Sequence, residues 1–127
     1  MVEVFKGRNS AEFEKISAIA DTDHDGPVLM INLNRYVPAA DFPNGTLYTD
    51  YMAALNMLLG QLGARILWQK PVRGQPIGEQ NIDEILAIWY PSHRAFLDLP
   101  ERPGSAENFR LRDVCVAYAV IHRCPGD

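Results

Sequence analysis

The chain has 127 residues, of which 47% are hydrophobic and 22% charged, and its formal net charge is −4. These values are typical of one ordinary globular domain, and they exclude a disordered or fibrous chain. The acidic balance, with no run of basic residues, argues against nucleic acid as a partner. No stretch approaches the ~18 apolar residues of a membrane span, and the start lacks a signal-peptide pattern, so we expect a cytoplasmic protein with no membrane partner. The two cysteines lack metal-site or redox spacing and indicate reduced thiols.

The first elements along the chain are a helix and a strand. Apolar residues at helical spacing predict a helix over residues 10–20, and Asn9 with Glu12 resembles a capping box at its start. The acidic turn that follows ends at Gly26 and Pro27, which break helices. Residues 28–33 then alternate as a strand does, and only one of the two faces carries polar groups toward its end, at Asn32 and Asn34.

A long helix follows a loop rich in Pro and Gly. Apolar side chains repeat every three or four residues over 47–62, and Thr46 stands in the position of an N-cap. Gly63 suits the positive φ common after a helix, so residues 64–69 are predicted to form the next strand. The segment 71–83 has no periodicity and reads as a long hairpin connection.

The remaining elements complete a repeated plan. Residues 84–90 form a third strand, and Ser92 caps a short helix that runs to residue 99. A second short helix is expected over 105–113 and a fourth strand over 117–123. This βαββαβ order predicts an α+β, ferredoxin-like domain with a four-stranded antiparallel sheet over residues 26–127, preceded by a helical extension over 1–25. Its helices cover one face of the sheet, so we expect a homodimer in which a second copy covers the other.

Five phrases of the sequence carry a family resemblance. They are VLMINLNRY, the pair Tyr48 and Tyr51, LGARILW, DEILAIWYPSHRAF, and LRD followed by AVIHR. In these phrases the chain resembles the small proteins of the domain-of-unknown-function family numbered 1330. The resemblance implies a dimeric α/β barrel, the fold of small cofactor-independent monooxygenases, muconolactone isomerases and haem-binding relatives, and it implies no settled reaction.

Polar residues of the first and last strands are the candidate catalytic groups. Asn32 is a ligand-binding candidate because a buried amide must find a hydrogen-bond partner. Arg35 could hold an anionic oxygen with its planar fork, or pair with a carboxylate of a partner subunit. His122 could move a proton, since imidazole titrates near neutrality, although a lone histidine in a strand is more often structural. His93 is expected at the start of an exposed helix, in a structural role.

Aromatic residues are the other ligand-binding candidates. Tyr48 and Tyr51 lie three residues apart and share a helix face, where they could position a substrate or simply fill a core or an interface. Trp68 and Trp89 could wall a flat ligand or pack the barrel. We expect Asn32, Arg35, Tyr51, Trp89 and His122 to converge on one partly buried cavity.

The acidic turn contains half of a known metal-binding pattern. Asp21, Asp23, Asp25 and Gly26 match the first half of an EF-hand loop, but position twelve is Asn32 where calcium requires a glutamate. We therefore expect no metal and no cofactor.

Two functions remain open. The first is a small-molecule-binding protein, which could act as a cofactor-independent oxygenase or isomerase on an apolar or aromatic substrate. The second is a dimeric interaction module without chemistry, and a haem site at His122 is a third, weaker alternative.

Overall fold

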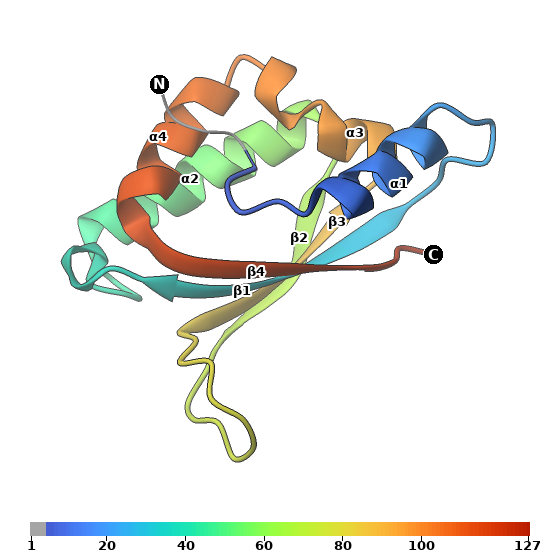
Figure 1. Ribbon diagram of the computed structural model, residues 1–127. Helices are drawn as coiled ribbons and strands as arrows, with labels where there is room; N and C mark the ends of the chain where they lie inside the picture. The colour runs from blue at the N-terminus through green and yellow to red at the C-terminus, as the bar shows by residue number, and fades with distance from the viewer. Residues whose placement is uncertain (1–4) are drawn as a thin grey trace.

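The computed structural model describes residues 5–127 and shows one sheet covered by helices on a single side (Figure 1). The elements are α1 (Ser10–Ala20), β1 (Val28–Tyr36), η1 (Pro38–Ala40), α2 (Thr46–Gln61), β2 (Arg65–Pro71), β3 (Glu84–Tyr90), α3 (His93–Leu97), η2 (Leu99–Glu101), α4 (Ser105–Cys115) and β4 (Val116–Pro125). The predicted helices and strands are confirmed, with ends that differ by a few residues at most.

The four strands are antiparallel and lie in the order β2-β3-β1-β4. The two strands in the middle are therefore first and third in the sequence, as the ferredoxin-like plan requires. β2 and β4 form the edges, and the connection between β2 and β3 extends away from the body of the protein (Figure 1). Ile77 in this connection is 88% exposed.

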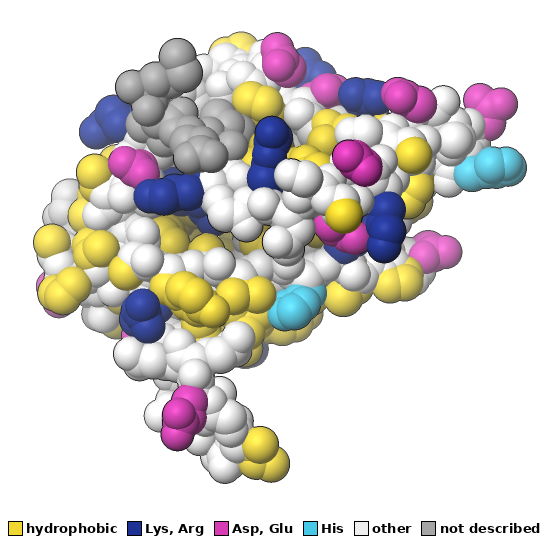
Figure 2. All heavy atoms as spheres, in the orientation of Figure 1, with side chains coloured by type: hydrophobic (Ala, Val, Ile, Leu, Met, Phe, Trp, Pro, Cys, Tyr) yellow, Lys and Arg dark blue, Asp and Glu magenta, His cyan; other side chains and the backbone are white. Residues whose placement is uncertain are grey.

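Strand alternation gives the sheet two unlike faces. In β1 the even-numbered residues are buried against the helices, while the odd-numbered ones are half-buried on the other side. We call the side away from the helices the open face of the sheet. Figure 2 shows hydrophobic side chains gathered along the lower side of β4, where this face comes into view.

The core lies between the sheet and the helices. α2 buries Tyr48, Tyr51, Leu55 and two further leucines at the predicted spacing, and they meet the even residues of β1 and β3. The extension contributes to the same core, because Ile16 of α1 is only 3% exposed. The backbone of Gly63 has φ +69°, which confirms the predicted left-handed position.

One predicted helix cap is wrong, and another is confirmed in position only. Asn9 is the N-cap residue of α1, but its side chain makes no capping hydrogen bond, and Thr46 is the first residue of α2 rather than its cap. Gly45 stands at the N-cap of α2 because a Cβ there would overlap the carbonyl oxygen of Ala40. Ser92 is confirmed as a cap, since its hydroxyl accepts a hydrogen bond from the Ala95 backbone N–H at 3.0 Å.

Candidate functional site

A cavity of about 540 Å³ lies between the helix side of the sheet and the helices. Its walls are mainly apolar and aromatic, and the segment around residues 5–9 lies across one side of it. Its volume falls within the range of small-molecule sites. Its apolar and aromatic wall includes Met30, Ile88, Tyr90, Phe96, Phe109 and Ile121.

Beside this cavity, a buried carboxylate organises one end of the sheet. Glu84 is 3% exposed, and its oxygens accept hydrogen bonds from the Tyr36 hydroxyl at 2.7 Å, the Tyr48 hydroxyl at 2.8 and 3.0 Å, and Gln69 Nε2 at 3.1 Å. Burial raises the pKa of both phenols above the ordinary value, and the hydrogen bonds to Glu84 raise it further. Both hydroxyls therefore keep their protons and act as donors to Glu84.

The bond from Tyr36 to Glu84 fixes the orientation of Asn34. The Tyr36 hydroxyl has one proton, which it donates to Glu84, so it can only accept a hydrogen bond from its other neighbour. That neighbour is Asn34, whose Nδ2 donates to the hydroxyl oxygen at 3.3 Å. Asn34 is 4% exposed, lines the cavity, and has no partner for its Oδ1. The strand thus holds an unpaired hydrogen-bond acceptor on a residue of the cavity wall.

A second unpartnered amide faces the same space from α4. Asn108 lines the cavity, is 2% exposed, and its Nδ2 has no hydrogen-bond partner. These two atoms, Asn34 Oδ1 and Asn108 Nδ2, are the buried side-chain atoms without a partner among residues 5–127. Leaving such a group unpaired costs about 1–3 kcal/mol. An unpaired acceptor and an unpaired donor therefore lie on two residues that line one cavity.

Arg112 brings positive charge to the cavity one helical turn after Asn108. It is half-buried, and within residues 5–127 its guanidinium forms no ion pair. Burial raises the pKa of Tyr51, and the nearby Arg112 charge opposes part of that rise. Arg112 acts in the same way on Tyr90, so its charge lies close to both cavity phenols.

Asn32 adds another acceptor beside Asn34. Its Nδ2 donates to the Met30 carbonyl oxygen at 3.1 Å, so its Oδ1 is the atom left for a ligand. Asn32 is 9% exposed and lines the cavity, as does Tyr51. The structure brings these two predicted residues together.

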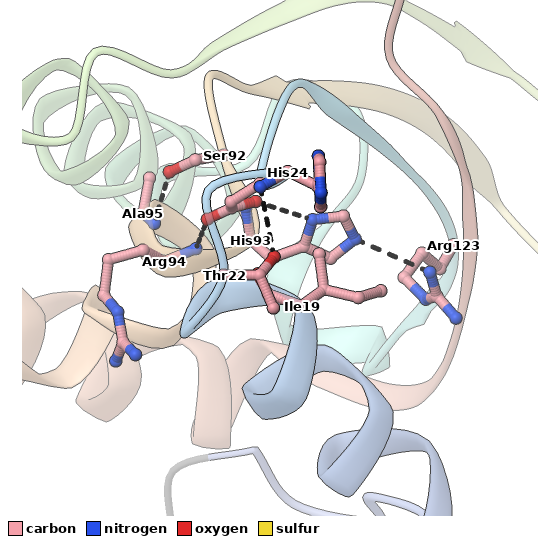
Figure 3. Close-up of polar contacts among 9 residues, drawn as sticks. Ile19, Thr22, His24, Ser92, His93, Arg94, Ala95 and Arg123 are labelled. Carbon is pink, nitrogen blue, oxygen red and sulfur yellow. Dashed lines mark hydrogen bonds and ion pairs between the residues drawn. The ribbon is translucent and has the colours of Figure 1, made fainter.

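A histidine of α3 is held between an aspartate and an arginine (Figure 3). His93 Nδ1 lies 2.9 Å from Asp25 Oδ1, and its Nε2 lies 3.5 Å from a nitrogen of Arg123. Arg123 also donates to Glu12 at 2.6 Å. Arg123 and Glu12 line the cavity, so this network ties α1 to β4 along its rim.

This network also shows what the acidic turn does. Asp25 accepts from the backbone N–H groups of His93 and Arg94 at the start of α3, and Asp21 pairs with the Arg94 guanidinium at 2.6 Å. His93 is 8% exposed, so its prediction as part of an exposed helix is wrong. Burial alone would raise the pKa of Asp25, but these donors together hold it below its ordinary value.

Of the other predicted site residues, only His122 lines the cavity with Asn32 and Tyr51. Arg35 pairs in register with Tyr118 on the open face, and its guanidinium lies 5.2 Å from the centre of that ring. His122 is among the residues that line the cavity, and its register partner in β1 is Ile31, an odd-numbered residue of the open face. Arg35 does not line the cavity, so the predicted convergence of Arg35 with Asn32 is wrong.

The tryptophans lie on the open face as well. Trp89 donates from its indole to the Gly126 carbonyl oxygen at 3.0 Å, and the Arg65 guanidinium lies 5.0 Å from its ring centre. Trp68 is 46% exposed and pairs with Ala87. Tyr48 of α2 lies between the helices and the sheet, where its hydroxyl donates to Glu84, and it does not line the cavity.

The comparisons with known proteins support the fold. The chain is similar to a protein of unknown function from Rhodopseudomonas palustris, with 26% identity, a TM-score of 0.73, and coverage of 98% of this chain and 95% of that one. The methylated form of that protein gives 25% identity, a TM-score of 0.75, and coverage of 98% and 96%.

A more distant similarity extends to a dimeric ferredoxin-like protein of unknown function from Thermobifida fusca, with 13% identity, a TM-score of 0.53, and coverage of 79% and 91%. No family model and no curated protein matches the chain, so the resemblance to family 1330 stays a prediction. Within residues 5–127, no helix has the length and apolar character needed to cross a bilayer. The chain has an α+β, ferredoxin-like fold.

Proposed function

We propose that this protein binds a small, mainly apolar molecule in the cavity between the sheet and the helices. The observation that carries the proposal is the pair of buried, unpartnered amide atoms, Asn34 Oδ1 and Asn108 Nδ2, in the wall of one cavity. Buried polar groups are nearly always hydrogen-bonded, and those that are not call for an explanation. A ligand that pairs with both atoms explains them.

The same observation favours binding over a purely structural module. A module whose helices only fill a core would gain stability by replacing such amides with apolar side chains. Here Asn32, Asn34, Asn108 and Arg112 line the same cavity as many aromatic and aliphatic side chains. Ligand sites combine an apolar wall with a few placed polar groups in this way.

The test uses N-phenyl-1-naphthylamine, a neutral apolar fluorophore that brightens when it leaves water. Ile88→Phe places a ring in the cavity, and Met57→Phe makes the matched addition on the exposed side of α2, where Met57 is 66% exposed. We expect one probe per chain for the wild type and Met57→Phe, and binding weaker by about tenfold or more for folded Ile88→Phe, since lost apolar contact of about 1.4 kcal/mol is tenfold. Equal binding by all three would refute the cavity as the site.

We propose further that two copies associate through the open face. This face carries exposed aromatic groups, with Trp68 46% and Tyr118 39% exposed, beside the half-buried odd residues of β1. Contiguous apolar surface of this kind is unusual on a monomer. The T. fusca protein with this fold is described as dimeric.

Light scattering with a charge substitution tests the dimer. We expect the wild type to show twice the chain mass of 14.3 kDa at micromolar concentration. Leu33→Glu, in the middle strand of the open face, should give a monomer because a buried charge without a partner is costly. Met57→Glu on α2 is the control and should remain dimeric. A wild-type monomer would refute this proposal.

A further inference from the structure

The polar groups on the strand side of the cavity differ from those on the helix side. β1 supplies acceptors, because Asn32 and Asn34 each donate from the amide nitrogen to a protein oxygen, so that Oδ1 is the group of each side chain left to accept a hydrogen bond. α4 supplies donors, namely Asn108 Nδ2 and the guanidinium of Arg112. A molecule that satisfies both sides must carry a donor toward the strand and an acceptor toward the helix.

The charges decide which kind of acceptor fits. Four residues that line the cavity are basic, and one, Glu12, is acidic and pairs with Arg123. The four basic residues are Lys6, Arg8, Arg112 and Arg123. Of these, Arg112 is half-buried near Tyr51 whereas the other three are exposed, and its planar fork matches a carboxylate in two parallel hydrogen bonds. The acceptor is therefore best supplied by an anionic oxygen.

The same charges decide which kind of donor fits. A ligand ammonium would be repelled by the basic residues around it and would lose its hydration on burial. A hydroxyl is uncharged and donates one hydrogen bond, which suits the single acceptor presented by Asn34. The aromatic wall of Phe96, Phe109 and Tyr90 suits an apolar or aryl body.

We propose that the ligand is a small hydroxycarboxylic acid with an apolar body, its carboxylate bound by Arg112 and Asn108 of α4 and its hydroxyl donating to Asn34 of β1. This inference rests on the proposed function and names the class of molecule that the cavity takes. Glu84 acts as a positioning residue in it. Through Tyr36, Glu84 holds Asn34 with its oxygen toward the ligand, without touching the ligand itself.

The test compares three ligands of nearly equal size by displacement of N-phenyl-1-naphthylamine. They are 2-hydroxy-4-phenylbutyrate, 4-phenylbutyrate, which lacks the hydroxyl, and 4-phenylbutane-1,2-diol, which lacks the carboxylate. We expect the hydroxy acid to bind about 3–10 times more tightly than the acid without the hydroxyl, and at least about tenfold more tightly than the diol. 2-Amino-4-phenylbutyrate should bind more weakly than the hydroxy acid.

Two variants assign these preferences to the two sides of the cavity. Asn34→Leu should bring the ratio between the hydroxy acid and 4-phenylbutyrate close to one. Arg112→Met keeps the apolar stem, and it should weaken both acids by about tenfold or more while leaving the diol unchanged. The wild-type comparison needs neither variant, so a variant that fails to fold does not remove the test.

The outcomes separate this inference from the proposed function. Equal affinity of the wild type for the three ligands, or preference for the amino acid, would overturn the hydroxy-acid assignment while the cavity remains a binding site. Binding of the probe without displacement by any of the acids would also overturn the hydroxy-acid assignment and leave the cavity as a binding site. Failure of the probe itself to bind would overturn both proposals.

Discussion

Tyr48→Phe removes one hydroxyl and tests the buried carboxylate cluster. In the wild type this hydroxyl lies 2.8 and 3.0 Å from the two oxygens of Glu84, which is 3% exposed. A hydrogen bond to a charged group contributes about 1.5–3 kcal/mol, and water cannot easily replace the lost donor at a site this buried. We expect the free energy of unfolding to fall by about 2 kcal/mol.

Urea unfolding followed by circular dichroism at pH 7 measures this change. With a urea dependence of about 2 kcal/mol per molar, the midpoint should fall by about 1 M with an unchanged slope. Tyr118→Phe is the matched control, because the Tyr118 ring lies on the open face and is 39% exposed. Its effect should stay within about 0.5 kcal/mol at the same protein concentration. Equal effects of the two substitutions would refute the role of Tyr48 as an essential donor to Glu84.

Three further perturbations have expected outcomes. Asp25 has a lowered pKa in the folded protein, so it stabilises the fold above the unfolded value of about 3.9, and this contribution is lost as pH falls through the folded value. The stability advantage of the wild type over Asp25→Asn should therefore shrink below about pH 4 in urea titrations, and a constant difference would contradict the assignment. Gly45→Ala forces a Cβ against the Ala40 carbonyl oxygen and should cost about 1–3 kcal/mol, whereas Gly60→Ala, with open space around it in α2, should be neutral or stabilising by up to about 1 kcal/mol. Asn108→Leu removes an unpaired buried donor, so the melting temperature should stay the same or rise while probe and acid binding weaken; a large loss of stability would show that the amide is structural.

Local patterns in the sequence were sufficient to predict the fold. The alternation in β1 and the apolar repeat of α2 identify their buried faces, because each pattern matches the geometry of its own element. The capping bond of α1 and the cap residue of α2 were predicted wrongly, since both depend on contacts rather than on residue type. Gly45 is required by the backbone around Ala40, which no local signal reveals.

The site was predicted only in part, because it depends on register between strands. The face on which His122 lies is set by its pairing with Ile31, and a shift of one residue would turn its side chain to the other face. Glu84 was recognised as the start of a strand, but its partners Tyr36 and Tyr48 come from two other elements. A charged residue that opens an apolar strand was the signal that could have identified it.

The groups on α4 were also missed. Asn108 and Arg112 occur in a short, polar helix, where such residues are usually exposed. They face the sheet because Phe109, Leu111 and Cys115 of the same helix are buried against the core. Their spacing of four residues places them on one face of α4, which was the available sign that they act together.

The most direct test of the ligand site follows the side-chain amide signals of the asparagines by nuclear magnetic resonance. On addition of 2-hydroxy-4-phenylbutyrate we expect large changes in the NH₂ signals of Asn108 and smaller ones in those of Asn34. Asn56 on the exposed side of α2, whose Nδ2 donates to Met52, should not change. Changes confined to the indole signals of Trp68 and Trp89, on the open face, would contradict a ligand site between the sheet and the helices.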